Sequence, residues 1–380
     1  MHIIDRYLLR QFMQNLLICF FSLMGLFVVI DAFTHLGEFL DCGRESGGIA
    51  AFMIRYYAYQ SLGFFDLTAS MLALMSAMFT ISWIQRHNEM TALMAAGVGT
   101  GRIVAPVILA AIAVVLVAAA NREFAIPKYR DELARRPGDL VGHRLRRFEP
   151  RRDNQTDILL SGENSIAKDR QIVKPEFSMP AWLREYGKQL TADNAYYLPR
   201  EGERPAGYLL ENVREPKNLD AKPSLFSGGQ PILVTYRDAP DWLKTNQCFL
   251  VSNLDFDQLT GSSATRDHSS VLQLIERLHN PSQDFGSKLR VLIHMRIVHP
   301  LIDITLLFLG LPLIITRESR NVFIAMGLCT AVTTAFMGVV LAMQWLGDNA
   351  VYGVNPALAA WAPLIVFVPI AVALAEPLWS

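Results

Sequence analysis

The chain alternates between two apolar regions and one long polar region. A helix needs about 20 apolar residues to cross a bilayer. Six runs approach or reach this length: residues 16–32, 61–84, 103–120, 291–315, 322–346 and 357–375. The pattern predicts an α-helical membrane protein with six transmembrane helices, arranged three plus three around an inserted domain. The expected boundaries are 1–121 for the first membrane half, 122–288 for the inserted domain and 289–380 for the second half.

The first apolar run resembles a secretory signal, because Arg6 and Arg10 precede it. However, no small-residue cleavage site follows residue 32, so we expect this run to remain as a membrane helix. Residues 3–13 mix apolar and basic positions, which predicts a short interfacial helix along the membrane surface before the first span.

The polar region contains short extended runs separated by Gly, Pro, Asn and Asp. These runs lie at 158–160, 170–173, 189–198, 207–213, 231–236 and 247–253. Short strands with regular turn signals are typical of an antiparallel sandwich or an open barrel. Leu272, Ile275 and Leu278 then follow at helical spacing, which predicts an amphipathic helix over 269–278 leading back into the membrane.

The connector between the second and third runs, RHNEMTALMAAGVGTGR, begins with strong helix formers. Met90, Leu93, Met94 and Gly97 share one face of a helix over about 86–97, with Arg86 and Glu89 at its edges; Gly97 suits the helix end. One interpretation is a surface helix lying among lipid head groups. The other is docking into a groove of a soluble motor protein, with Met and Leu side chains as anchors.

Composition supports a membrane protein, since 52% of the residues are hydrophobic and only 18% are charged. Basic and acidic residues balance at 35 each, so the overall charge does not suggest a nucleic-acid partner. The short loops on one predicted side carry Arg6, Arg10, Arg86, Arg102, Arg317 and Arg320. By the positive-inside rule this side is cytoplasmic, which places both termini in the cytoplasm and the inserted domain outside.

Catalytic and metal motifs are weak. The sequence has no G-x-x-x-x-G-K-[ST] phosphate-binding loop, so we expect no ATP hydrolysis by this chain. The cysteines, at 19, 42, 248 and 329, lack metal-ligand spacing, and we expect Cys42 and Cys248 to be independent thiols. His294 and His299 lack a third ligand nearby, so they are interpreted as packing residues. We expect no metal and no catalytic residue.

Two aspartates, Asp66 and Asp303, lie within apolar runs, where an ionisable side chain is a functional candidate. An intramembrane enzyme acting on lipid or protein through these carboxylates is therefore one alternative hypothesis. Protonation, or pairing with a neighbouring helix, explains both residues without catalysis and is favoured. A membrane-anchored scaffold is a further alternative.

The connector also carries a family resemblance. RHNEMTALMAAG at 86–97 resembles the coupling segment of the LptF/LptG (YjgP/YjgQ) family, the permeases of the lipopolysaccharide export ABC transporter. The similarity extends to IIDRYLLRQF at 3–12, NREFAIPKY at 121–129, HMRIVHPL at 294–301 and AAWAPLIVF at 359–367. It therefore covers both membrane halves in order. The resemblance implies that the inserted all-β domain is a periplasmic jellyroll-like domain in an inner-membrane protein.

The resemblance further implies a set of partners. A cytoplasmic ABC ATPase dimer would use ATP and bind the coupling helix, so this chain would bind no cofactor itself. A second homologous permease subunit, identical or different, would complete the membrane core. The lipid substrate, lipopolysaccharide or a related amphiphile, would leave the outer leaflet of the inner membrane for periplasmic jellyroll bridge proteins. A single-span jellyroll subunit is a further expected partner.

The expected lipid path lies near the outer helix ends. Its candidate residues are Phe27, Asp31, Phe33, His35, Arg55, Arg290 and Arg296. The three arginines are candidates to meet an anionic head group, but for each one alone snorkelling to ordinary phospholipid is slightly favoured. Asp31, His35 and Glu38 make the outer end of the first span acidic, whereas family members that carry phosphorylated lipids tend to place cations there. The sequence leaves open both the lipid and whether the chain is of the F or G type.

Overall fold

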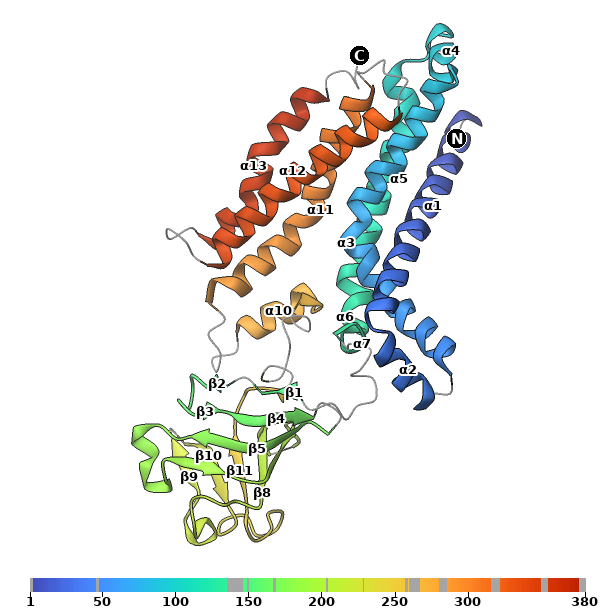
Figure 1. The fold of residues 1–380 in the computed structure, drawn as a ribbon. Helices are drawn as coiled ribbons and strands as arrows, with labels where there is room; N and C mark the ends of the chain where they lie inside the picture. The colour runs from blue at the N-terminus through green and yellow to red at the C-terminus, as the bar shows by residue number, and fades with distance from the viewer. Residues whose placement is uncertain are drawn as a thin grey trace.

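A computed structural model shows a helical bundle joined to a separate β domain (Figure 1). It describes residues 3–45, 48–134, 146–148, 150–166, 169–202, 204–227, 229–256, 259, 267–279, 286–315, 322–349 and 355–375. Within these ranges, the side chains of 41–45, 131, 146–147, 184–185, 286–287, 313–315, 322–326 and 329 are not described.

Six helices in the described part of the chain are long and apolar enough to cross a membrane. The first half supplies α1 (Ile3–Thr34), α3 (Ile49–Arg86) and α5 (Thr100–Ala120), and the second half supplies α11 (Gly286–Ile315), α12 (Val322–Asp348) and α13 (Pro356–Leu374). Shorter helices connect or extend them: α2 (Leu36–Glu45), α4 (Glu89–Ala95), the π-helix η1 (Asn121–Ala125), α6 (Ile126–Lys128) and α7 (Arg130–Ala134). The predicted three plus three arrangement is confirmed.

Two helices begin earlier than their apolar runs. The separate surface helix predicted over 3–13 is wrong, because α1 runs without a break from Ile3 into the first span. No glycine or proline interrupts residues 3–24, so nothing in this stretch ends the helix. Similarly, α3 begins at Ile49, twelve residues before the predicted run at 61, since the polar side chains in 49–60 are compatible with a helix that extends beyond the hydrocarbon.

The inserted domain is all β and antiparallel in its described part. Its strands are β1 (Arg146–Arg147), β2 (Arg151–Arg152), β3 (Leu159–Leu160), β4 (Gly162–Ile166), β5 (Gln171–Ser178), β6 (Gln189–Thr191), β7 (Asn194–Leu198), β8 (Gly207–Glu211), β9 (Leu225–Ser227), β10 (Gln230–Thr235) and β11 (Gln247–Val251). The main path runs β1-β4-β5-β7-β8-β11-β10-β9. One end of β5 pairs with β4 and β7, and its other end pairs with β3 and β6, so β5 joins two parts of the sheet.

The membrane bundle and the β domain each have their own core. Leu8 and Phe12 of α1 pack with α3, α5 and the second half in the bundle. The β domain buries a separate set around Phe177 and Tyr208, with alternating buried positions along β7 as a half-buried strand requires. The helix α10 (Val271–Leu278) lies between the two bodies and packs through Leu274 on the start of α11 (Figure 1).

The connector α4 and both marked chain ends lie at one end of the bundle, and the β domain lies at the other (Figure 1). This separation agrees with the two sides expected from the sequence. The predicted cations Arg317 and Arg320 fall outside the described residues.

Candidate coupling and transport sites

The connector after α3 folds into a short helix with defined ends. Asn88 adopts a left-handed conformation with φ of 58°, which separates α3 from α4. At the other end, Gly97 has φ of +84°. The Gly97 N–H donates to the Met94 carbonyl at 2.9 Å and the Val98 N–H donates to the Leu93 carbonyl at 3.1 Å. This pair of bonds is a Schellman helix end, for which glycine is the favoured residue.

The predicted coupling residues differ in their exposure. Met90 is 5% exposed and packs in the core of this chain, so its side chain is not available to a partner. Leu93 is half-buried against the same core, whereas Met94 is 44% exposed and Arg86 is also exposed. Met94 is therefore the predicted apolar anchor that the structure leaves most open.

The start of α1 lies beside this connector. The Tyr7 hydroxyl donates to Glu89 Oε1 at 3.4 Å, and Arg102 at the start of α5 lies 3.4 Å from Asp5. Glu89 is half-buried as a result, and we interpret it as a residue that orients α4. These contacts connect the first residues of α1 to both ends of the connector.

At the opposite end of α1, three of the predicted path residues lie in one polar and aromatic cluster. Tyr57 of α3 donates to Asp31 Oδ2 at 3.0 Å, and His35 Nδ1 lies 3.1 Å from Asp31 Oδ1. The Phe27 ring packs edge-on against Tyr57 with 6.4 Å between ring centroids. The acidic end of α1 is thus bonded to α3 rather than fully open to a passing lipid.

Other path candidates are dispersed over the outer helix ends. Phe33 of α1 is 75% exposed, and Arg55 of α3 and Arg290 of α11 are exposed as well. They come from three different helices. The structure therefore keeps them accessible but does not gather them into a built head-group site.

Immediately beyond α5, three consecutive polar residues contact two distant parts of the chain, α3 and the start of α10. They belong to η1, where the helix widens from α to π geometry. Asn121 donates to the Leu62 carbonyl of α3 at 2.9 Å, and Arg122 Nε donates to both oxygens of Asp66 at 2.8 and 3.1 Å. Glu123 Oε2 accepts the backbone N–H of Val271, the first residue of α10, at 3.0 Å.

Asn121, Arg122 and Glu123 and their partners form a charged junction that also contains Arg296. Arg296 was one of the candidates for contact with a lipid head group. The structure contradicts that assignment as far as accessibility is concerned, because the Arg296 side chain is only 7% exposed. Its guanidinium lies 3.8 Å from Glu123 Oε1 and donates to the backbone carbonyl of Asp267. Burial beside these groups lowers the pKa of His268, so its imidazole is neutral at neutral pH and adds no charge to the junction.

The two intramembrane aspartates are both paired. Asp66 is held by Arg122, and Asp303 Oδ2 lies 3.0 Å from His299 Nδ1 one helical turn away. Asp303 Oδ1 is buried and has no hydrogen-bond partner among the described residues. The two aspartates therefore belong to separate pairs, which gives no support to a joint catalytic site. Among the described residues no cluster of three or more His, Cys, Asp or Glu could hold a metal ion.

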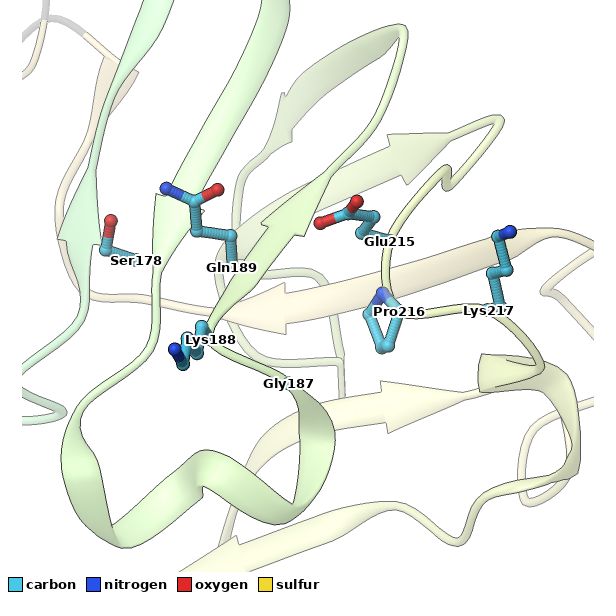
Figure 2. A pocket seen from close by; sticks show the side chains of 7 residues that line it. All are labelled: Ser178, Gly187, Lys188, Gln189, Glu215, Pro216 and Lys217. Atoms are coloured by element: carbon cyan, nitrogen blue, oxygen red, sulfur yellow. The ribbon is translucent and has the colours of Figure 1, made fainter.

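The β domain has an open hollow where β5, β6 and the segment at 215–217 meet (Figure 2). Its volume is about 560 Å³, and its charged lining residues are Lys188, Glu215 and Lys217. Both lysines are exposed and the hollow is open to solvent, so the lining does not define a ligand.

The charged junction escaped prediction from sequence because its partners are far apart along the chain. Arg122 and Asp66 are 56 positions apart, and Glu123 and Val271 are 148 apart. One local signal was present: Asn121, Arg122 and Glu123 follow directly on an uninterrupted apolar run. Charges that continue a membrane helix need partners, which is a reason to search for them.

Comparison with known proteins places these features in one family. The family model described as lipopolysaccharide export system permease LptF/LptG matches residues 6–144 and 246–376. The comparison with curated proteins finds no match. The matched segments include all six spans, the connector α4 and the charged junction, and together they exceed half of the chain. The chain therefore belongs to the LptF/LptG family of lipopolysaccharide export permeases, multi-pass proteins of the inner membrane.

Proposed function

We propose that this chain is one permease subunit of an ATP-driven exporter that takes lipopolysaccharide, or a related amphiphilic lipid, from the outer leaflet of the inner membrane. A separate cytoplasmic ATPase dimer docks on α4, and a second permease subunit completes the membrane core. The observation that supports this most directly is the family match together with the exposed, well-formed helix α4.

Docking on α4 has a physical basis. The helix is held to its own chain through Met90 and Tyr7. Met94 is 44% exposed, and its sulfur accepts a hydrogen bond from the Thr100 hydroxyl at 3.5 Å. An apolar side chain on a fixed short helix can fill a groove of a partner, as in other helix-in-groove complexes. Because α4 directly follows α3, a force on α4 reaches the membrane helix through the turn at Asn88.

The lipid path rests on the chemistry of the substrate. A charged head group with several acyl chains cannot pass through a narrow aqueous pore, so a lateral opening between membrane helices is the expected route. Residues of α1 such as Ile18, Phe21, Ile30 and Phe33 are all more than half exposed. These side chains are available to lipid or to the second subunit, and Arg55 and Arg290 are exposed cations that can meet an anionic head group. The β domain, as a jellyroll-like periplasmic domain, then passes the lipid to periplasmic bridge proteins of similar fold.

Replacing the exposed anchor tests the proposal. Met94→Arg should weaken docking of the ATPase, since an unpaired charge would be buried in the interface, at a cost of roughly 2 kcal/mol or more. The membrane fold should be retained because Met94 lies outside the core of this chain. The measurement is the amount of ATPase that co-purifies with the tagged permease in mild detergent.

Met94→Leu is the matched control, since it preserves the apolar contact at the same position. Loss of ATPase with Met94→Arg and retention with Met94→Leu would support docking through this face. Equal recovery of the ATPase with all three proteins would refute it and favour a helix that only rests among head groups.

A further inference from the structure

The return of the chain from the β domain to the membrane is held by two charged side chains from different membrane halves. Glu123, on the extension of α5, accepts the Val271 N–H at 3.0 Å. Arg296 of α11 donates to the Asp267 carbonyl, four residues earlier in the same segment. Residues 267–271 are therefore bonded to both halves at once.

The segment 267–271 leads directly into the capped start of α10. Ser270 caps α10: its hydroxyl accepts the Gln273 N–H at 3.3 Å, and the Gln273 side chain accepts the Ser270 N–H at 3.1 Å. The Val271 N–H is one of the donors that a helix start leaves without a partner in its own helix, and a carboxylate there also favours the positive end of the helix dipole. Glu123 thus fixes the start of α10 from outside the helix.

Glu123 lies in η1, the part of the helix with π geometry. The first half is anchored by Asn121 and Arg122, which both bond to α3. Glu123, the next residue, contacts α10 and lies 3.8 Å from Arg296. A π turn inside a helix rearranges neighbouring side chains and is frequent at functional sites.

From these contacts we infer that Glu123 and Arg296 are positioning residues that set the orientation of the β domain relative to the two membrane halves. We call residues Glu123, Arg296 and the segment 267–271 the return clamp. When the halves move relative to each other, the return clamp makes the β domain follow. This inference rests on the proposed function only for its consequence, which is delivery of lipid into a correctly placed β domain.

The pairing makes a clean variant available. Arg296 is the buried member of the pair, at 7% exposed against 32% for Glu123. Removing Glu123 alone would leave the buried Arg296 charge uncompensated, whereas removing both charges is tolerated better. The double variant Glu123→Gln/Arg296→Met should therefore fold and insert, while it loses the ion pair and the bond to Asp267. Glu276→Gln is the matched control, because Glu276 is exposed on the same helix α10.

The test measures a distance and lipid transfer in the same samples. Spin labels are placed at Ala50, at the outer start of α3, and at Lys217 in the β domain, both exposed, in a background without native cysteines. The full chain is reconstituted in lipid nanodiscs with its ATPase and second permease subunit. Double electron–electron resonance measures the distance distribution between the two spin labels. Crosslinking of lipopolysaccharide to a purified bridge protein measures lipid transfer.

We expect a narrow distance distribution in the parent and in Glu276→Gln. The double variant should lose the narrow peak and transfer lipid severalfold less while still hydrolysing ATP. Glu123→Asp, which retains the charge but is shorter, should also broaden the distribution, and it provides a second measurement if the double variant is poorly folded. A narrow peak in both variants, or a broad peak with unchanged transfer, would overturn the inference. Absence of transfer in the parent would instead overturn the proposed function. The distance distributions would still show whether the return clamp orients the β domain.

Discussion

Arg122 is a buried charge whose removal should have a large effect. Its side chain is 10% exposed and that of Asp66 is 16% exposed. Arg122→Met would leave the Asp66 carboxylate without its partner within the membrane helix α3. We expect a loss of about 3 kcal/mol in the free energy of unfolding, as for other broken buried ion pairs. Unfolding by sodium dodecyl sulfate in mixed micelles measures the change.

The double variant Asp66→Leu/Arg122→Met separates charge from shape at this position. It removes both charges, so most of the stability should return. If the double variant is as unstable as Arg122→Met, the uncompensated carboxylate is not the cause of the loss.

Cys248 should be an unreactive thiol in the folded protein. It is fully buried in β11, and burial raises its pKa above the ordinary value for cysteine. A raised pKa keeps the thiol protonated, and only the thiolate is nucleophilic. Maleimide labelling of a variant that retains Cys248 alone should therefore remain slow between pH 7 and 9, where an ordinary exposed cysteine, such as Lys217→Cys, reacts faster as the pH rises.

Denaturation should abolish the difference between these two cysteines. Rapid labelling of native Cys248 at pH 7 would show that the core of the β domain opens readily. The side chain of Cys42 is outside the described residues, so the expectation that Cys42 and Cys248 are independent thiols stays a prediction.

For single residues, the sequence indicated which side chains are unusual but not which partners they contact. It singled out Asp66 and Asp303 as ionisable side chains within apolar runs, and Arg296 as a cation near a helix end. It could not give their partners, since a contact between positions 56 apart depends on how α3 and α5 pack. It also placed Met90 among the docking residues of α4, although the Met90 side chain is buried against the body of the protein.

Among the elements, α12 is a helix whose close packing on its neighbours depends on a glycine. A Cβ added at Gly347 would lie 2.6 Å from the Ala359 Cβ of α13 and 2.9 Å from Val291 of α11. Neither contact can be relieved by a long flexible side chain, so Gly347→Ala must separate the helices. Small residues allow such close approach in membranes. We expect a loss of roughly 1–3 kcal/mol in stability.

Gly338 on the same helix provides the control for Gly347. A Cβ added at Gly338 would meet no described atom within 4 Å, so Gly338→Ala should be tolerated. Thermal unfolding in detergent, followed by size-exclusion chromatography, compares the two variants. Equal stability of Gly347→Ala and Gly338→Ala would contradict the close packing of α12 on α11 and α13.

The elements themselves were largely predictable, for a local reason. An apolar run of membrane length can be recognised from adjacent residues alone, and all six were found. Short strands are different: β4 reads GENSI and β9 has three residues, so neither shows the alternation that identifies a strand. Their pairing with β5 and β10 decides their structure.

For the whole molecule, the orientation in the membrane is the prediction with the widest consequences. The connector and the β domain lie at opposite ends of the bundle (Figure 1). If the arginine-rich loops are cytoplasmic, a single cysteine at Lys217 should react with a membrane-impermeant thiol reagent once the outer membrane is permeabilised. A cysteine at His87, exposed between α3 and α4, should react only after the inner membrane is opened.

Both sites are exposed, so a difference between them reports on the membrane and not on burial. Labelling of His87→Cys in intact inner membranes would reverse the assigned orientation. It would also place α4 on the wrong side for a cytoplasmic ATPase, and docking as proposed would then be impossible.

The π turn at Asn121–Ala125 has a consequence for how such a chain can change by insertion or deletion. A π turn contains one residue more than the corresponding α turn. In an ordinary helix, adding or removing one residue rotates everything beyond it by about 100°, which would misplace the following residues. Deleting one residue within 121–125 would instead restore a regular helix and leave both flanks facing as before. Inserting or deleting one residue can therefore create or remove the contacts of Asn121, Arg122 and Glu123, while the rest of the membrane helix keeps its orientation.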